Sequence, residues 1–505
     1  MTRKVKVLYP VILSICPAVF LYVNNLKYSV MPISKLLICI SGITFISFII
    51  YWLIRITLRI DSKKAGIITA ALINIIVYFP FWYRIINAGR NNLLLFIIAV
   101  ASIVLFAFIS HYILKTTKDL TNITIFFNKT SLILLAMIII NGIYFLVDIR
   151  DDVRDKIRTQ QSGSSTIYPN IYYIILDAYA RQDILANIYD FDNSEFIEYL
   201  KDKGFYVAKK SRSNYSLTVN SLASSMNSIY LDEIIEKEGE YSSNQRPLIE
   251  LINNSSIRKY LSRYRYKFIV YSSGYHAIEN KYADEYIETE IKIEYEIMVI
   301  KATIIGYILD GRLLEIESNI HKNKILHILD RISEDNEDGP SFRFAHIMCP
   351  HPPFVFGDAK LNSNYLYADG SDLHFNEERL KNQYIKAYSE QITYINQKLK
   401  AILNKLLSES KQKPIIILQA DHGPRLLTKW NSPNESDQNE SVSIFNAIYL
   451  PNHDIGLYEH ITPVNTFRFI KQKYFKEKID MLQDKSYYCV GNHRPYKSTQ
   501  IPNER

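Results

Sequence analysis

The pattern of hydrophobic and polar positions divides this chain of 505 residues into two unlike parts. Residues 1–148 consist mainly of Ile, Leu, Phe and Val, with few acidic residues. Within them, five stretches are apolar enough, and long enough, to cross the core of a bilayer. They cover about 7–24, 34–54, 66–83, 92–114 and 131–148. The pattern therefore predicts an N-terminal domain of five transmembrane helices.

Basic residues flank these five stretches unequally. Ten of them fall in the N-terminal tail and in the loops after the second and fourth stretches: Arg3, Lys4, Lys6, Arg55, Arg59, Lys63, Lys64, Lys115, Lys118 and Lys129. The opposite loops hold four: Lys27, Lys35, Arg84 and Arg90. Because basic loops stay in the cytoplasm, we expect a cytoplasmic N-terminus and an exterior location for everything after Leu146. The first stretch lacks a small-residue cleavage site, so we expect it to be retained.

A charged and then polar segment follows the last apolar stretch. Ile149, Val153 and Ile157 recur every four residues among charged ones, which predicts a short amphipathic juxtamembrane helix. Residues 160–166 (Gln-Gln-Ser-Gly-Ser-Ser-Thr) are typical of a flexible linker. Helix and linker together cover 149–168, so 169–505 forms the outer domain, which is long enough for one large core.

The outer domain alternates short apolar runs with helical patterns. Runs at 170–176, 267–272, 343–348, 414–420 and 444–450 predict strands, and 380–407 keeps a helical period. Strand–helix alternation predicts an α/β fold with a mostly parallel sheet covered by helices on both faces.

Two of the predicted strands lead into an aspartate. Asp177 follows the first run, and Asp421 follows the fourth and precedes His422 and Gly423. Polar residues just past parallel strands meet at the carboxyl edge of the sheet, where ligands bind. Two carboxylates and an imidazole there predict a divalent-cation site. The alternative is that the aspartates are ordinary strand-end turn residues.

A third segment, 213–227, is rich in hydroxyl side chains and predicts a loop entering a helix. Thr218 lies near the N-cap, and Leu222 and Met226 lie on the buried face. Thr218 is either that cap or a nucleophile, because a helix dipole and a nearby cation both favour an alkoxide.

These motifs resemble the alkaline phosphatase/sulfatase superfamily, and most closely its membrane-anchored branch of lipoteichoic acid synthases and phosphoethanolamine transferases. The resemblance covers about 169–475. Asp177 matches the first metal ligand, although this branch usually has Glu there, and Asp421-His422-Gly423 matches the Asp-His-Gly pair. Thr218 stands at the nucleophile position. Sulfatases carry Cys-x-Pro-Ser-Arg there, whereas this chain has Asn220 for Pro and Leu222 for Arg, so the resemblance argues against formylglycine chemistry.

The resemblance also implies roles for the site residues. Asp177, Thr218, Asp421 and His422 would hold one divalent ion, Zn²⁺ or Mn²⁺, and Thr218 would be phosphorylated. His351, in a His-Pro-Pro-Phe segment, would bind phosphate or protonate a leaving alcohol. The further substrate-binding candidates are His346, Arg181 and Arg425. The alternatives are a core histidine for His346 and solvated surface positions for the arginines, and His276 and His493 are each a site residue or a surface residue.

Three classes of function agree with this reading of the chain. The first is a transferase at the cytoplasmic (inner) membrane of a bacterium, moving phosphoethanolamine or phosphoglycerol from a phospholipid donor to a cell-surface glycan on the periplasmic or extracellular side. The second is a hydrolase of phosphate or sulfate esters, and the third is a non-catalytic binding module. Basic stripes with interleaved aromatics are absent from the sequence, so nucleic acid is not an expected partner. Pairing of Cys349 with Cys489 is left open by their spacing.

Overall fold

The computed structural model describes residues 5–25, 32–86, 92–152, 168–280, 283–289, 293–334, 339–359, 378–429, 432–451 and 456–502. The chain divides into two compact units. The first contains Met1–Lys156 and Ile291–Glu317, and the second contains Ile157–Glu290 and Ser318–Arg505. We call them the helical unit and the catalytic unit.

Each of the five predicted apolar stretches lies in a helix of the helical unit. These helices are α1 (Tyr9–Asn25), α2 (Ile33–Thr57), α3 (Ser62–Ile86), α4 (Asn92–Lys115) and α5 (Thr121–Asp152). Within the described residues, two segments are long and apolar enough to cross a membrane: α2 and Thr121–Ile143 of α5. Only 11% of each is buried in the protein, so both present apolar side chains outward. Helix α1 and Val100–Lys115 are apolar but shorter, so the structure supports fewer spans than the predicted five.

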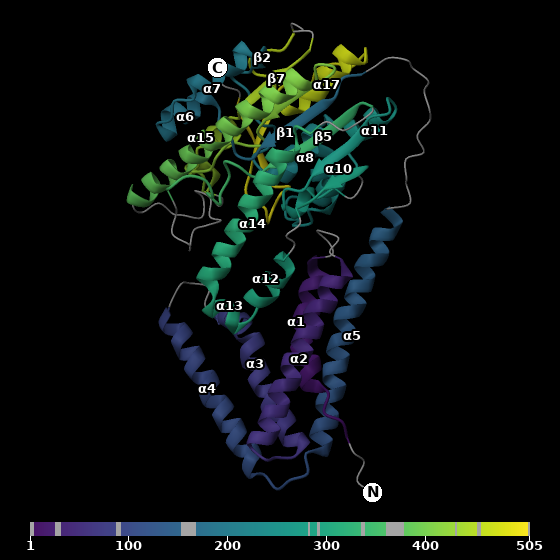
Figure 1. Cartoon of the computed structure of the whole chain (residues 1–505), viewed down its shortest axis with the longest axis vertical. Helices are drawn as coiled ribbons and strands as arrows, with labels where there is room; N and C mark the ends of the chain where they lie inside the picture. The colour runs from purple at the N-terminus through teal and green to yellow at the C-terminus, as the bar shows by residue number, and fades with distance from the viewer. Residues whose placement is uncertain are drawn as a thin grey trace. The chain divides into compact units, whose positions relative to one another are not determined.

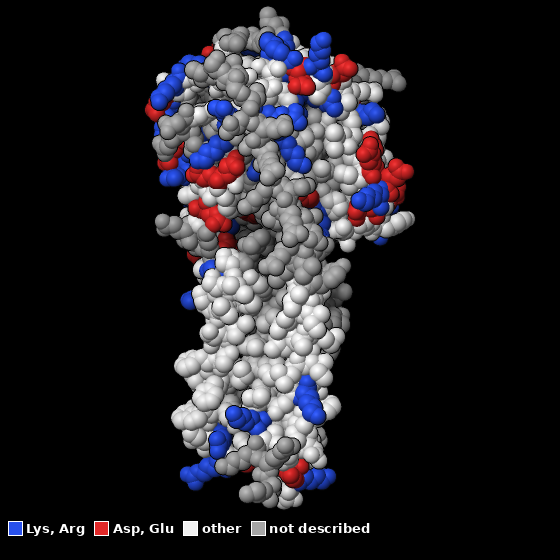
Figure 2. Space-filling view, turned by 90° about the vertical axis from the view of Figure 1, so that its right-hand side faces the viewer, with Lys and Arg blue, Asp and Glu red and all other residues white. Residues whose placement is uncertain are grey.

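Helix α1 packs against α2, α3 and α5. Its first turn has backbone N–H groups without intrahelical partners, and the Asn128 side chain of α5 accepts from two of the nearby N–H groups, those of Leu8 and Tyr9, at 3.0 Å each. Figure 2 shows Lys and Arg gathered at one end of the helical unit, with a nearly uncharged surface above them. Basic residues beside an uncharged surface are typical of helices that cross a membrane.

The segment Ile291–Glu317 belongs to the helical unit although it lies between catalytic-unit segments in the sequence. It contains α12 (Glu294–Lys301), α13 (Ile304–Ile308) and the start of α14 (Asp310–Arg331). Nothing in the hydrophobic pattern had separated it from the outer domain.

A seven-stranded sheet organises the catalytic unit. In spatial order its strands are β2 (Phe205–Val207), β7 (Asn446–Tyr449), β6 (Ile415–Gln419), β1 (Ile171–Leu176), β5 (Ser341–Ile347), β3 (Lys267–Tyr271) and β4 (Glu285–Ile287). Strands β6, β1, β5, β3 and β4 are parallel, and β7 is antiparallel to both β6 and β2. A separate hairpin joins β8 (Ser486–Cys489) and β9 (Ser498–Ile501). The prediction of a mostly parallel α/β sheet is confirmed. The five predicted strands are β1, β3, β5, β6 and β7 of the structure.

Helices cover both faces of this sheet (Figure 1). The described helices of the catalytic unit are α6 (Gln182–Tyr189), α7 (Ser194–Asp202), α8 (Thr218–Asn227), α9 (Asp232–Glu238), α10 (Arg246–Asn253), α11 (Ser256–Ser262), α14 from Ser318 onward, α15 (Glu378–Glu409), α16 (Gln438–Val442) and α17 (Pro463–Tyr474), with 3₁₀ turns η1 (His276–Ile278) and η3 (Pro433–Glu435). Helix α15 confirms the helical period predicted over 380–407.

Strand β1 shows why a central strand can be apolar at every position. Tyr172, Ile174 and Leu176 join a core with side chains of α6, α7, α14 and α15. On the other face, the Tyr173 hydroxyl donates to Ser225 of α8 at 3.2 Å, and its ring packs edge-to-face on Phe467 of α17. Burial of each such side chain contributes about 1.5–3 kcal/mol. A strand buried on both faces therefore appears as a continuous apolar run.

Two further expectations from the sequence concern the juxtamembrane segment and the pairing of Cys349 with Cys489. Most of the juxtamembrane helix and the linker expected over 149–168 lies outside the described residues, and the described part, up to Asp152, continues α5. Cys349 and Cys489 are both buried free thiols, so no disulfide joins them in the structure.

Candidate metal and nucleophile site

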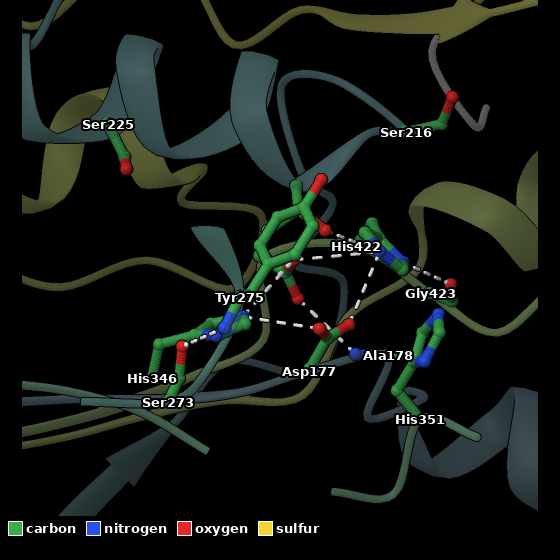
Figure 3. Close-up of polar contacts among 12 residues, drawn as sticks. Asp177, Ala178, Ser216, Ser225, Ser273, Tyr275, His346, His351, His422 and Gly423 are labelled. Carbon is green, nitrogen blue, oxygen red and sulfur yellow. Dashed lines mark hydrogen bonds and ion pairs between the residues drawn. The ribbon is translucent and has the colours of Figure 1, made fainter. Parts of the chain in front are cut away.

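Three neighbouring parallel strands bring the predicted acidic residues together. Asp177 follows β1 directly, Asp421 lies two residues beyond β6, and His346 lies in β5 paired with Ile175 of β1. One ligand atom from each of Asp177, His346 and Asp421 lies within 4.8 Å of the other two, and all three residues are buried. Figure 3 shows the side chains of Asp177 and His346 pointing toward one another. We call this set the acidic centre.

Thr218 reaches the acidic centre from the N-terminus of α8. It is the first residue of the helix, and the capping position is taken by the extended Leu217, which makes no side-chain cap. The expectation that Thr218 caps the helix is therefore not met in its geometry. Instead, Thr218 Oγ1 lies 3.2 Å from Nε2 of His422. Leu222 and Met226 are fully buried, as expected.

The hydrogen bonds of His422 determine which of its nitrogens carries the proton. Nδ1 lies 2.7 Å from the carbonyl oxygen of Gly423. A carbonyl only accepts, so Nδ1 must be the donor. Burial and the guanidinium of Arg425 lower the pKa of His422, which keeps the ring neutral. Nε2 therefore presents a lone pair, to which the Thr218 hydroxyl and Arg425 Nη2, at 3.0 Å, can donate.

Several electron-rich atoms converge on the same point. His422 Nε2 lies 3.4 Å from Asp177 Oδ1 and 3.6 Å from Asp421 Oδ2. Neither carboxylate oxygen accepts a hydrogen bond from the described residues. Unsatisfied buried acceptors facing one another are costly without a positive charge among them. Carboxylate oxygen and neutral imidazole nitrogen are ligands of both zinc and manganese, so the residues fit a divalent cation.

His346 lies on the other side of the carboxylates. Its Nε2 is 3.2 Å from Asp177 Oδ2 and 3.9 Å from Asp421 Oδ2. Burial would lower the pKa of His346, but the two nearby carboxylates outweigh it and raise the pKa to about 9. A protonated His346 thus balances the carboxylates when no metal is bound. The structure places this residue in the acidic centre, where sequence reasoning had given it substrate binding or core packing.

Asp177 remains ionised in these surroundings. Burial would raise its pKa, but the opposing influence of His351, His346 and His422 is larger and lowers it. His351 itself lies at the rim. Its backbone N–H donates to the Asp177 carbonyl at 3.1 Å, its Nδ1 donates to the Pro352 carbonyl at 2.6 Å, and its ring centroid is 6.1 Å from that of His422.

The two candidate arginines occupy different surroundings. Arg425 is buried beside His422 and also donates to the Ser216 carbonyl at 2.7 Å. Arg181 forms a bidentate pair with Asp183, at 2.6 and 2.8 Å, and donates to the Ser211 carbonyl. His493 is exposed, and the side chain of His276 lies outside the described part of the chain.

Tyr275 is a site residue that sequence reasoning missed. It follows β3 by four residues, and its ring centroid lies 6.4 Å from that of His346. Burial raises the pKa of its phenol, and the charges of Asp177 and Asp421 add to this rise. In Figure 3 the ring lies across the acidic centre. Its position just past a parallel strand was the available signal, although tyrosine is too frequent in this chain to stand out.

The C-terminal segment supports the loop that carries Thr218. The Ser216 hydroxyl accepts from the Cys489 backbone N–H at 2.9 Å, and the Asn220 side chain donates to the Pro495 carbonyl at 2.8 Å. On the His422 side, a β-carbon at Gly423 would clash with the Glu440 carbonyl oxygen. The Glu440 carboxylate accepts from the N–H groups of the two residues after Arg425, at 2.8 Å each.

A parallel α/β sheet with a hydroxyl, carboxylates and imidazoles at its carboxyl edge defines a class of metal-dependent enzymes acting on phosphate or sulfate esters. The sulfatase family model matches residues 169–467, which is more than half of the chain. The chain therefore belongs to the sulfatase family and is a sulfatase-like enzyme of the alkaline phosphatase superfamily. The resemblance found in the sequence is confirmed at this level.

Solved structures with similar folds share little sequence with the chain. The zinc complex of the C-terminal periplasmic domain of EptC from Escherichia coli is 9% identical, with a TM-score of 0.42 over 67% of this chain and 94% of that one. The lipooligosaccharide phosphoethanolamine transferase A of Neisseria meningitidis is 11% identical, with a TM-score of 0.38 over 92% and 94%. The phosphonate monoester hydrolase of Agrobacterium radiobacter is 9% identical, with a TM-score of 0.40 over 64% and 80%. No curated protein sequence matches the chain.

Proposed function

We propose that this enzyme transfers a phosphoethanolamine- or phosphoglycerol-type group from a membrane phospholipid to a cell-surface glycan, through a phosphorylated Thr218. The observation that carries the proposal is the hydrogen bond of Thr218 Oγ1 to the unprotonated Nε2 of His422, beside the acidic centre. A hydroxyl next to a base and a cation-binding site is the arrangement expected of an activated nucleophile.

The reaction has two balanced steps. In the first, Thr218 Oγ attacks the phosphorus of the donor diester, a P–O bond to threonine forms, and the bond to the lipid alcohol breaks. In the second, an acceptor hydroxyl attacks the same phosphorus and the bond to Thr218 breaks. In the structure the Thr218 hydroxyl donates to His422 Nε2. Because that nitrogen would be a metal ligand in the loaded enzyme, the threonine proton then leaves to solvent, and His351 at the rim is placed to protonate the departing alkoxide.

Asp177, His346, Asp421 and His422, together with Thr218, would hold one divalent ion, Zn²⁺ or Mn²⁺. When bound, such an ion supplies Lewis-acid stabilisation of a threonine alkoxide and of phosphate charge. Arg425 adds a buried guanidinium on the His422 side and is the better placed of the two arginines to donate to a phosphate oxygen. Tyr275 would border the bound phosphate from the opposite side.

The membrane half supports a lipid donor. We propose that all five helices α1–α5 span the cytoplasmic membrane of a bacterium, with the N-terminus inside and the catalytic domain, about 169–505, on the periplasmic or extracellular side. The unequal distribution of basic residues and the outward apolar surfaces of α2 and α5 support this topology.

Hydrolysis of phosphate esters, with water as the acceptor, is the second candidate. The two functions share the first step and differ only in the nucleophile of the second. Sulfate esters are a weaker candidate, because Thr218, Asn220 and Leu222 replace the residues of the formylglycine motif.

Substitution of Thr218 tests the covalent step. Thr218→Ala should abolish release of labelled head group from a phospholipid, because it removes the attacking oxygen. Thr218→Ser should retain partial turnover. Ser221→Ala is the matched control, since Ser221 lies on the same helix, is also buried and likewise loses a hydroxyl. Turnover by Thr218→Ala at the wild-type rate would refute the covalent mechanism.

The destination of the label separates the two candidate functions. Purified full-length enzyme is incubated with head-group-labelled phospholipid in the presence and absence of an envelope glycan fraction. Label transferred to glycan supports the transferase, whereas label that appears only as water-soluble product supports the hydrolase. Peptide mass analysis after a slow donor should find the phosphate-linked adduct on the peptide that contains Thr218.

A further inference from the structure

The segment Ile291–Glu317 offers a surface that the proposed chemistry does not use. It lies between β4 and β5 in the sequence, yet it forms a compact unit with α1–α5. Helix α12 contacts α1 and α2, and α13 contacts α3. We call α12 and α13 together the helical hairpin.

Specific contacts hold the helical hairpin against the bundle. The Tyr295 hydroxyl donates to the Ala18 carbonyl of α1 at 2.7 Å, and its ring packs edge-to-face on Tyr22 at 5.9 Å between centroids. Glu296 pairs with Lys35 at the start of α2 at 2.8 Å. These contacts lie in the C-terminal half of α1 and in the first turn of α2.

The turn between α12 and α13 is tightly built. Thr303 caps α13, since its hydroxyl oxygen accepts from the Gly306 N–H at 3.3 Å and its O–H donates to the Ile300 carbonyl at 2.7 Å. A β-carbon at Gly306 would clash with the backbone of Ile300 and Lys301. The two short helices therefore hold one defined shape, and the side chains of α13 project from a fixed base.

Large apolar side chains project outward from this base. They are Ile300 near the end of α12, Ile305, Tyr307 and Ile308 of α13, and Leu309 just after it. We call these five residues the α13 apolar face, and Ile308 is 72% exposed. The described part of the catalytic unit, although larger, exposes only Ile229, Tyr241 and Leu427 among its large hydrophobic residues. A patch of this kind marks an interaction surface.

We propose that the α13 apolar face lies in the lipid interface of the membrane, with its isoleucine side chains among acyl chains and Tyr307 at the head-group level. The patch belongs to the same compact unit as α2 and α5, whose large apolar side chains are exposed along their length. A tyrosine beside aliphatic residues on a short helix is typical of interfacial segments. The partner is a phospholipid bilayer, and its head-group chemistry need not be that of a substrate.

Depth-dependent quenching tests the lipid contact in the full chain. Ile308→Cys is labelled with an environment-sensitive fluorophore and reconstituted in nanodiscs of phosphatidylethanolamine and phosphatidylglycerol, with or without lipids bearing a nitroxide on the acyl chain. Tyr241→Cys is the matched control, because Tyr241 is 76% exposed but belongs to the catalytic unit. Both variants carry Cys39→Ser, since Cys39 is the one native cysteine that is not buried.

The expected result is a blue-shifted Ile308 probe that is quenched several-fold more strongly by the nitroxide lipids than the Tyr241 probe. Ile305→Cys should repeat this result. Equal quenching at Ile308 and Tyr241 would overturn the proposal. So would shielding of Ile308 that depends on protein concentration and not on nitroxide lipid, because a second copy of the chain would then cover the face. The measurement does not involve catalysis, so it stands or falls separately from the proposed function.

Discussion

Replacement of His346 by glutamine tests the electrostatics of the acidic centre. The imidazole lies 3.2 Å from Asp177 and 3.9 Å from Asp421, and these carboxylates raise its pKa from 6.5 to about 9 in the metal-free protein. Because the folded pKa is above the unfolded one, the resulting stabilisation is fully present below about pH 6.5 and is lost as the pH rises through about 9. One pKa unit corresponds to about 1.4 kcal/mol, so the contribution is about 3 kcal/mol.

Thermal unfolding of the metal-stripped, full-length protein in detergent measures this contribution. Glutamine also loses packing, but that loss is the same at every pH. We therefore expect His346→Gln to lose about 3 kcal/mol more relative to wild type at about pH 6 than at about pH 10, which corresponds to about 6 °C in Tm for a domain of this size. Loading with Zn²⁺ should reduce the difference, because a metal ion competes with the proton for the imidazole.

His321→Gln is the matched control. Burial, and then the charge of His351, lower the pKa of His321 to about 4, so this histidine destabilises the folded state as the pH falls below 6.5. Its replacement should therefore show a smaller pH dependence of opposite sign. An equal loss for His346→Gln at both pH values would show that His346 is only a packed core histidine, and the electrostatic reasoning would be refuted.

Two further predictions concern the metal and the topology. Elemental analysis of the purified protein should find about one equivalent of a divalent metal, strongly reduced in Asp421→Ala, because that variant removes a carboxylate from the acidic centre; full metal content in this variant would contradict the assignment. A reporter fused after Thr166 should be active only outside the cytoplasm, and cytoplasmic activity would overturn the five-span topology.

The central sheet was predictable because its strands are buried on both faces. Each of β1, β5 and β6 is fully buried, and β1 is apolar at every position. Strand β6 is apolar except for Gln419, whereas β5 also contains Ser341, Arg343 and His346. Strands β2 and β4 were not predicted, since each is three residues long and lies at an edge of the sheet. A run of three residues carries no measurable period.

The sequence alone could not place His346 in the acidic centre, because this placement depends on the register between two strands. The residue lies inside a strand, and its proximity to Asp177 follows from the register that pairs it with Ile175. This register is set by contacts between two strands that lie far apart in the sequence: the paired residues Ile171 and Phe342 are 171 residues apart. Asp177, Asp421 and His422 were easier to assign because each directly follows a recognisable run.

The two candidate arginines have the same spacing in the sequence but different contacts in the structure. Arg181 and Arg425 each lie four residues after an aspartate of the acidic centre, Asp177 and Asp421. Both carboxylate oxygens of Asp183, two residues after Arg181, accept from the Nε–Nη2 edge of that guanidinium. An acidic residue in this position was visible in the sequence as a competing partner.

Arg425 has no acid two residues later, because Leu427 occupies that position. The backbone after it is held by Glu440, a residue from α16 that no local pattern associates with the loop. With the backbone held there, the Arg425 side chain lies against the Ser216 carbonyl and His422. A phosphate-binding role is therefore better supported for Arg425 than for Arg181, although the sequence offered the same spacing for both.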